Sequence, residues 1–249
     1  MQHLIHYIFG IADNCLILGQ RLGELCGHGP SLETDIALTN MSLDLLGQTR
    51  SYYQYVAKLQ GAPATEDTVA FLRTEREYRN VLLAEQPNTD FAHVIARHFY
   101  FDVFHLLLLE KLQHSNDATL AAIAAKAVKE VSYHKRFTSD WVKRLGDGTA
   151  ESHQRMQDAI DALFIFTDEL FQQTDADLAM IETGVGIDVT VFKEVYYNTV
   201  RDILTEATLV MPESPYFRSG GKSGIHSEHM GYILAEMQYM QRTYPNMTW

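Results

Sequence analysis

The sequence predicts an all-α protein built as a bundle of long helices. Apolar residues recur with helical periodicity along most of the chain, and the strict alternation that marks a strand is nearly missing. Proline and glycine gather in a few clusters, which cut the chain into long helical pieces. With 46% hydrophobic and 21% charged residues, the chain buries a sizeable core as one large domain or two small ones.

The first half of the chain divides at its helix-ending residues. The segment Gly27–Pro30 ends the first helix, and Ser31 or Thr34 caps the second, which runs to Gly61. Thr65 begins a shorter segment, and the helix after it is apolar on all sides, as a buried central helix is. We expect these helices over about residues 4–26, 31–61, 65–87 and 88–114.

The second half begins with an alanine-rich helix that starts near Asp117 and stops at Gly146–Gly148. A long irregular linker, residues 211–224, carries both proline and glycine and separates the last two helices. We expect the helices of this half over about residues 117–146, 152–174, 175–182, 188–208 and 227–243.

Charge and cysteine content narrow the class of protein. A net charge of -12 and a pI near 5.3 disfavour nucleic acid, whose phosphates need a basic face. The N-terminus lacks the basic residues of a secretory signal, and the most apolar segment, residues 99–109, is too short to span a bilayer. Cys15 and Cys26 lie too far apart on one helix for a disulfide, so we expect both to be reduced thiols in the core, which suits the cytoplasm.

The most informative feature is an absent motif. Four-helix di-iron proteins supply a Glu from each of two helices and a Glu-x-x-His pair from each of the other two. This sequence contains no Glu-x-x-His. Asp44 has Gly47 in the histidine position, and Glu130 has His134 one residue too far along. We therefore expect a helical subunit that lacks metal chemistry and works beside a subunit that retains it.

Long strings of the sequence carry a family resemblance from Asp13 to the C-terminus. They are DNCLILGQRLGELCGHGPSLETDIALTNMSLDLLGQTR, LLAEQPNTDFAHVIARHFYFD, KAVKEVSYHKRF and RSGGKSGIHSEHMGYILAEMQYMQR. These strings resemble the C subunits of bacterial phenylacetyl-CoA epoxidases, which are multicomponent ring oxygenases. The resemblance implies one ferritin-like helical domain over residues 1–249, with a four-helix bundle core and additional helices.

The resemblance also implies the partners and cofactors. A C subunit of this kind has no metal site or catalytic residue of its own and pairs with a related A subunit that carries the di-iron centre. A small B subunit and a reductase with a flavin and an iron-sulfur cluster complete the system. It consumes NADPH and O2 to epoxidise the aromatic ring of phenylacetyl-CoA.

The bundle interior has its own candidate residues. On the central helix, Asp90 and His93, and Asp102 and His105, stand at spacings that place a carboxylate and an imidazole on one face. Together with His98, the second pair predicts a buried hydrogen-bonded cluster rather than a metal site, which needs several convergent ligands. Where a relative holds metals, we expect ion pairs and hydrogen bonds among the following residues: Asp44, Asp102, His105, Glu130 and His134. The first helix adds Gln20 and Glu24, on the interior or the surface.

A glycine-rich segment, residues 218–224, superficially matches a phosphate loop. The match fails because Tyr216 holds the place of the first glycine and no strand precedes the loop. Two cations before a helix are nevertheless suited to an anionic group. Given the family resemblance, Arg218 and Lys222 are candidates to contact the CoA phosphates of a substrate held mainly by the partner. A flexible loop with solvated charges, or an intersubunit salt bridge, is the alternative.

Several further features suit either an interface or the core. His226, Glu228 and His229 precede a methionine-rich helix, and capping or interface roles fit them better than a metal. The candidate pairing surfaces are Tyr52, Tyr53 and Tyr55, the pair Tyr196 and Tyr197, and the last helix.

Three hypotheses remain open at this point. The first is a non-catalytic scaffold subunit of an oxygenase. The second is an independent ferritin-like metalloprotein that uses the displaced Glu130 and His134 with Asp102 and His105. The third is a helical interaction protein unrelated to any oxygenase.

Overall fold

Helices account for all the regular structure in residues 1–245 and 247, which the computed structural model describes, and none of these residues lies in a strand. The predicted all-α class is therefore confirmed. The α-helices are α1 (Gln2–Gly23), α2 (Leu32–Gln60), α3 (Glu66–Phe71), α4 (Leu82–Glu85), α5 (Phe91–Leu112), α6 (Ala118–Gly146), α7 (Ala150–Phe164), α8 (Asp175–Glu182), α9 (Lys193–Glu206), α10 (Glu228–Met237) and α11 (Tyr239–Thr243). Short 3-10 helices cover Glu75–Glu77, Asp168–Phe171, Val189–Phe192 and Gly221–Ser223.

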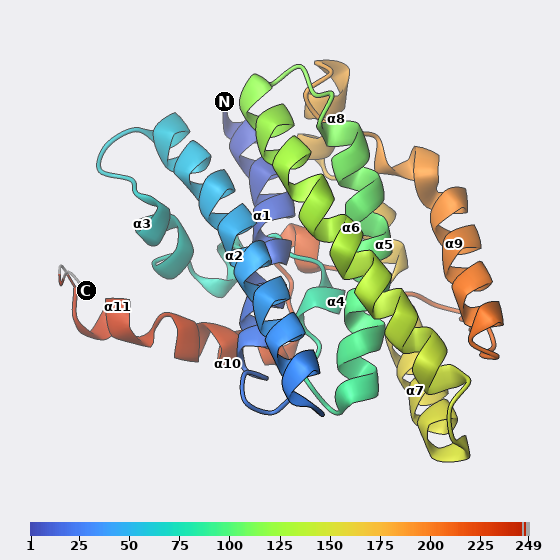
Figure 1. Cartoon of the computed structure of the whole chain (residues 1–249). Helices are drawn as coiled ribbons and strands as arrows, with labels where there is room; N and C mark the ends of the chain where they lie inside the picture. The colour runs from blue at the N-terminus through green and yellow to red at the C-terminus, as the bar shows by residue number, and fades with distance from the viewer. Residues whose placement is uncertain (246, 248–249) are drawn as a thin grey trace.

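Four long helices form the central bundle (Figure 1). The closest pairs are α1 with α2 and α5 with α6, and α2 also packs against α6. The helices α7 and α9 cover α5 and α6, while α8 packs on α1. This is the ferritin-like bundle with additional helices that the sequence predicts. The helix α5 is buried along most of its length, as its apolar sequence indicates.

The helix starts follow from their capping residues. The Ser31 side chain accepts the backbone N–H of Thr34 at the start of α2, and Asp117 accepts two backbone N–H groups at the start of α6. The helix α5 is capped by Asp90, whose carboxylate accepts the N–H of His93. The expected caps of α5, Asn88 and Thr89, were therefore one or two residues early.

Three expected helices are interrupted. The segment 65–87 contains only α3, α4 and a 3-10 turn, and 152–174 is helical to Phe164 and then forms a 3-10 turn. At that break Thr167 Oγ1 donates to the carbonyl of Phe164 at 2.8 Å, which satisfies a carbonyl at the helix end. The last segment, 227–243, divides into α10 and α11 at Gln238.

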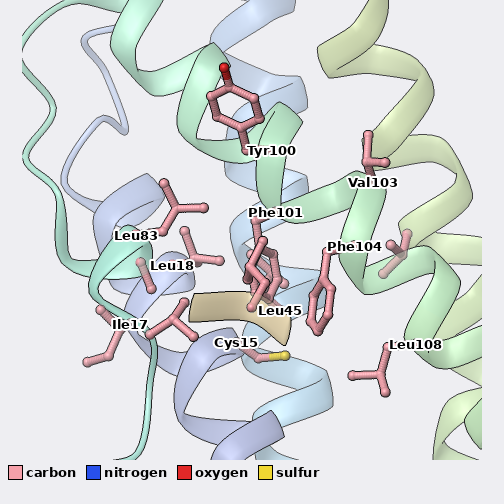
Figure 2. Close-up of a cluster of buried hydrophobic side chains, with 14 of the residues drawn as sticks. Cys15, Ile17, Leu18, Leu45, Leu83, Tyr100, Phe101, Val103, Phe104 and Leu108 are labelled. Atoms are coloured by element: carbon pink, nitrogen blue, oxygen red, sulfur yellow. The ribbon is translucent and has the colours of Figure 1, made fainter. Parts of the chain in front are cut away.

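Large apolar side chains from the central helices fill the core. Figure 2 shows Cys15 of α1, Leu45 of α2 and Phe101, Phe104 and Leu108 of α5 gathered in one region. All five are at most 6% exposed. Close packing of this kind between helices is the main source of stability for a bundle. No helix in the described residues is long and apolar enough to cross a membrane.

A buried ion pair joins the bundle to the irregular segment 72–81. Asp13 of α1, which is fully buried, contacts the Arg73 guanidinium through two hydrogen bonds of 2.7 and 2.9 Å. The Tyr53 hydroxyl donates to the same carboxylate at 2.5 Å, and the guanidinium lies 4.1 Å from the ring centroids of both Phe9 and Tyr78. The interruption of the 65–87 segment places Arg73 within reach of Asp13.

Replacing Asp13 is expected to destabilise the protein strongly. Asp13→Asn leaves the Arg73 charge buried without its carboxylate partner, so we expect a loss of about 3 kcal/mol in the free energy of unfolding. Arg50→Gln breaks the exposed Arg50–Glu66 pair and serves as the control, with an expected loss below about 1 kcal/mol. Urea denaturation followed by circular dichroism measures both. Equal effects of the two substitutions would contradict the role of the buried pair.

Candidate functional site

A cluster of polar side chains pairs across the four helices, from the buried interior to the edge of the α2–α6 contact, where the side chains of Asp44 and Glu130 are 37% and 22% exposed. His134 of α6 is fully buried, and its Nε2 lies 3.0 Å from Asp44 Oδ2 on α2. One turn away, Gln48 Nε2 donates to Glu130 Oε2 at 3.0 Å. The expected candidates Asp44, Glu130 and His134 thus lie together at the α2–α6 contact. His134 is paired with Asp44 rather than with Glu130.

The other two long helices join the same cluster. The Cys15 Sγ of α1 lies 3.8 Å from Gln48 Oε1 and 3.9 Å from His105 Nε2 of α5. On the α5–α6 side, Thr138 Oγ1 donates to Asp102 Oδ2 at 3.1 Å. Every one of the four helices therefore contributes a polar group to this interior. The contacts run from helix to helix in pairs instead of meeting at one point.

This donor set does not fit a carboxylate-bridged dinuclear metal centre. Such a centre needs several ionised carboxylates that converge from four helices, with histidines to complete the coordination. Here α1 supplies a thiol, and α2 supplies Asp44, already paired, and the amide of Gln48. Among the residues that the structure describes, Asp102 Oδ1 and both ring nitrogens of His98 have no hydrogen-bond partner. Nevertheless, no three His, Cys, Asp or Glu side chains converge as possible ligands within residues 1–245 and 247.

Burial controls the charge of this interior. It raises the pKa of Asp102 to about 7 and lowers the pKa of His105 to about 3, where the nearby His134 charge acts in the same direction. Burial also lowers the pKa of His98 well below its ordinary value, with the Arg97 charge adding to the effect. Near neutral pH His98 and His105 are therefore neutral, and Asp102 is close to its midpoint. The interior thus disfavours isolated charge.

Two positions on α2 explain why the metal-ligand pattern fails. Gly47, in the expected histidine position three residues after Asp44, is exposed, and a Cβ built there meets no atom within 4 Å. The inward position is Gln48, four residues after Asp44 and 4% exposed. Gly47 lines a pocket of about 200 Å³ together with Gln48 and Glu130, so a histidine at position 47 would stand at the exposed edge of the cluster and outside its buried part. The first-helix candidates lie at the margin, where Gln20 is half-buried and Glu24 pairs with Arg21.

The glycine-rich segment 218–224 is fixed by a buried carboxylate. Glu169, which is fully buried, accepts the backbone N–H groups of Gly220 at 2.8 Å and Leu82 at 2.7 Å. A Cβ on Gly221 would lie 2.1 Å from the carbonyl oxygen of Asn80, so only glycine allows this close approach. Hydrogen bonds thus tie the segment to the bundle, and Glu169 already occupies amides that the sequence offered to an anion.

The two cations of this segment point to different places. Lys222 Nζ donates to the carbonyl oxygens of Leu170 at 3.1 Å and Gln172 at 2.6 Å, and burial lowers its pKa. The Arg218 side chain is exposed, with its guanidinium 5.9 Å from the ring centroid of Phe166. Lys222 also lines a cavity of about 470 Å³ beside Arg79, whereas Arg218 does not. A joint contact with CoA phosphates stays a prediction.

The start of α10 is anchored in the same manner. The fully buried Glu85 lies 2.5 Å from His226 Nδ1 and accepts both the N–H and the hydroxyl of Ser227, at 2.8 and 2.6 Å. Burial lowers the pKa of His226, but the hydrogen bond and charge of Glu85 outweigh it and raise the pKa overall. His226 therefore holds the C-terminal helices on the bundle, while Glu228 and His229 have no described role in that contact.

Comparison with known proteins identifies the family. The family model for the phenylacetic acid catabolic protein matches residues 1–249. The chain belongs to this family. It is 49% identical to the C subunit of the 1,2-phenylacetyl-CoA epoxidase of Escherichia coli strain K12, over the full length of both chains. The resemblance that the sequence strings carry is thereby confirmed, as is a place among the subunits of phenylacetate catabolism.

Sequence reasoning about this family member missed three interior residues. Gln48 was detectable, because a position four residues after Asp44 lies on a neighbouring part of the same helix face. Cys15 lies in the core as expected, but its contacts with Gln48 and His105 carried no signal, and neither did Thr138, since a thiol or hydroxyl on an apolar helix face is usual in any core. The same expectation for Cys26 is wrong, because Cys26 lies beyond the end of α1 and is exposed. The proposed pairing tyrosines are largely internal, because Tyr52, Tyr53 and Tyr196 are at most 1% exposed.

The raised pKa of Asp102 predicts a pH-dependent stability. The folded protein keeps a proton up to about pH 7, whereas the unfolded chain releases it near pH 4, so this contribution is lost as pH rises through 7. Asp102→Asn has no proton to release. We expect its free energy of unfolding, relative to wild type, to rise by about 2 kcal/mol between pH 5 and pH 8.

Urea titrations at the two pH values measure this difference. The control is Asp140→Asn on the exposed face of α6, for which the difference from wild type should not change with pH. A constant difference for Asp102→Asn as well would show that the carboxyl group ionises normally inside the bundle.

Proposed function

We propose that this chain is the non-catalytic structural subunit of a phenylacetyl-CoA epoxidase complex. It pairs with the related A subunit, whose di-iron centre epoxidises the aromatic ring of phenylacetyl-CoA with O2 and NADPH. The observation that carries the proposal is the bundle interior, where side-chain pairs such as Gln48 with Glu130 stand in place of metal ligands. Full-length similarity to a C subunit supports the same role.

The interior pairs give the subunit a shape that does not depend on iron. In many metal-binding proteins the metal ties together elements that are otherwise unstable. Here the contact of His134 with Asp44 joins α6 to α2, and the hydrogen bond of Thr138 to Asp102 joins α6 to α5. Such a subunit offers its partner a rigid surface whether or not the partner holds its metals.

The remaining components follow from the same proposal. The di-iron centre belongs to the A subunit, and a small B subunit and a reductase with flavin and an iron-sulfur cluster deliver the electrons of NADPH. The assembly works in the cytoplasm, which agrees with Cys15 and Cys26 being free thiols. Nothing in the donor set favours the alternative of an independent metalloprotein built on Glu130, His134, Asp102 and His105.

Metal analysis tests the proposed role directly. The chain purified alone after iron reconstitution is expected to hold no stoichiometric iron or manganese, and EDTA should leave its melting temperature unchanged within about 1 °C. Co-expression with the A subunit should yield a stable complex that epoxidises phenylacetyl-CoA when the B subunit, the reductase and NADPH are added. Two tightly held irons per isolated chain, with an oxo-bridge absorption band, would contradict the proposal.

A contact with the CoA moiety is the finer part of the proposal. We expect Arg218→Glu to weaken phenylacetyl-CoA binding to the assembled complex about tenfold, since a charged phosphate contact is worth roughly 1.5 kcal/mol. Lys222→Gln should act in the same direction. Arg201→Glu, on the exposed face of α9, is the matched control and should leave affinity unchanged. Unchanged affinity in both test variants rejects the contact but leaves the scaffold role intact.

A further inference from the structure

We propose that the outward ridges of α2 and α6 form the docking surface for the catalytic subunit. We call this surface the α2/α6 face and define it by Leu32, Ile36 and Leu43 of α2 and Tyr133, Phe137 and Trp141 of α6. Its occupant is an apolar helical surface of the catalytic subunit with an acidic rim. This inference rests on the proposed function and adds to it the place and chemistry of the contact.

An aromatic ladder runs along the outside of α6. Tyr133, Phe137 and Trp141 follow one another at intervals of four residues, which places them on one helix face. Their ring centroids are 6.0 and 6.4 Å apart in sequence order, and Phe91 at the start of α5 extends the ladder with a ring 5.0 Å from Trp141. Tyr133 is 40% exposed and the other three are half-buried. Clustered, partly exposed aromatic rings are typical of the centre of a protein interface.

An apolar ridge follows the outside of α2. Leu32, Ile36 and Leu43 are 71%, 51% and 61% exposed, and their spacings of four and seven residues place them on one helix face. The core needs none of them, because Leu38 and Leu45 on the opposite face are at most 2% exposed. Three large aliphatic side chains thus stand exposed along one face of a rigid helix, and exposed apolar side chains that line up in this way mark a candidate interaction site.

The two ridges belong to the same side of the bundle. Contacts between Asp44 and His134 and between Gln48 and Glu130 hold α2 beside α6, and Figure 1 shows both helices crossing the near side of the bundle. These are also the two longest helices, with 29 residues each. A partner that lies across both therefore meets a broad and rigid surface. The side-chain pairs between α2 and α6 thus fix how the outer faces of these two helices lie relative to each other.

The exposed cations of α6 indicate the kind of partner that binds the α2/α6 face. Lys129, Arg136 and Arg144 are exposed along α6, and the guanidinium groups of Arg136 and Arg144 lie 5.7 and 5.5 Å from the ring centroids of Tyr133 and Trp141. The Lys and Arg ion pairs of α6 in the described residues are Lys126 with Glu130 and Lys143 with Glu206, which leaves these three cations without a carboxylate. They outnumber the exposed acids on the same ridges, Glu33 and Asp140.

This cationic strip favours a different chain over a second copy. A two-fold contact between copies would use the same patch on both sides and bring like charges together. A partner with an acidic rim would pair with Lys129, Arg136 and Arg144 instead. The strip stands out because the whole chain carries a net charge of -12. The occupant is therefore a different chain with an acidic rim, and under the proposed function that chain is the catalytic subunit.

The test compares four double variants for binding to the catalytic subunit by biolayer interferometry. We expect Ile36→Glu with Leu43→Glu to weaken binding by more than about tenfold, since buried apolar anchors dominate interface affinity. Its matched control is Val191→Glu with Val195→Glu, which changes two valines 67% and 53% exposed near the start of α9 and should alter affinity less than about twofold. All the replaced side chains are exposed, and circular dichroism and melting temperature check that each variant folds.

The charge component has its own pair of variants. Lys129→Glu with Arg136→Glu should weaken binding about tenfold and reduce its dependence on salt, because rim charges act through screened attraction. Lys58→Glu with Lys111→Glu makes the same change in net charge at exposed positions of α2 and α5 outside the α2/α6 face. This control should bind as wild type does at physiological salt.

The outcomes separate this surface from the proposed function. If wild type binds the catalytic subunit and both test variants bind equally well, the α2/α6 face is wrong and the scaffold role stands. Equal weakening by the Val191 and Val195 control also overturns the assignment. If wild type does not bind at all, both proposals fail. If light scattering finds a wild-type dimer that only the test variants dissociate, a second copy covers this face and the proposed occupant is wrong.

Discussion

Direct pairing of polar side chains inside the bundle is the constraint on which the rest of the structure depends. A buried polar group without a partner is costly, and an unpaired buried charge costs more. Asp44 with His134 and Gln48 with Glu130 satisfy this demand across the contact between α2 and α6. In a di-iron protein the metals perform this cross-linking. Here side-chain pairs link the helices of the ferritin-like bundle directly.

Buried carboxylates organise the irregular segments in a similar way. Asp13 binds Arg73, Glu85 binds the start of α10, and Glu169 binds the amides of Gly220 and Leu82. Each carboxylate takes donors from a segment that has no helical partners for them, so backbone that would otherwise be unpaired becomes part of the core. The glycine-rich segment therefore owes its conformation to an internal anion, and its resemblance to a phosphate loop is fully explained by Glu169.

The sequence predicts the long helices well because periodicity and capping residues are local. Ser31, one of the two expected caps, begins α2, a helix starts at Asp117 as expected, and the expected candidates at the α2–α6 contact do lie together. The sequence could not predict which of these side chains pair with each other, because Asp44 and His134 stand 90 residues apart and nothing local specifies their contact. The interrupted helices fail for a related reason: the hydrogen bonds of Arg73 and Glu169 to distant elements outweigh the helical preference of their own segments.

The pairs of Asp44 with His134 and Gln48 with Glu130 also explain why several substitutions would be needed to build a metal site in this ferritin-like bundle. Restoring histidine at position 47 would place it on the exposed side of α2, because the inward position is Gln48. A metal bound to Glu130 would meet the amide nitrogen of Gln48, which is a donor and not a ligand. Asp44 would have to leave His134 before it could bind the metal. Cys15 would present a thiol whose pKa is strongly raised by burial. The changes at Gln48, Asp44 and Cys15 each break a contact of the folded chain, and a charge added there would meet the same burial that raises the pKa of Asp102. Single substitutions at these contacts therefore cost stability before they create a set of convergent ligands.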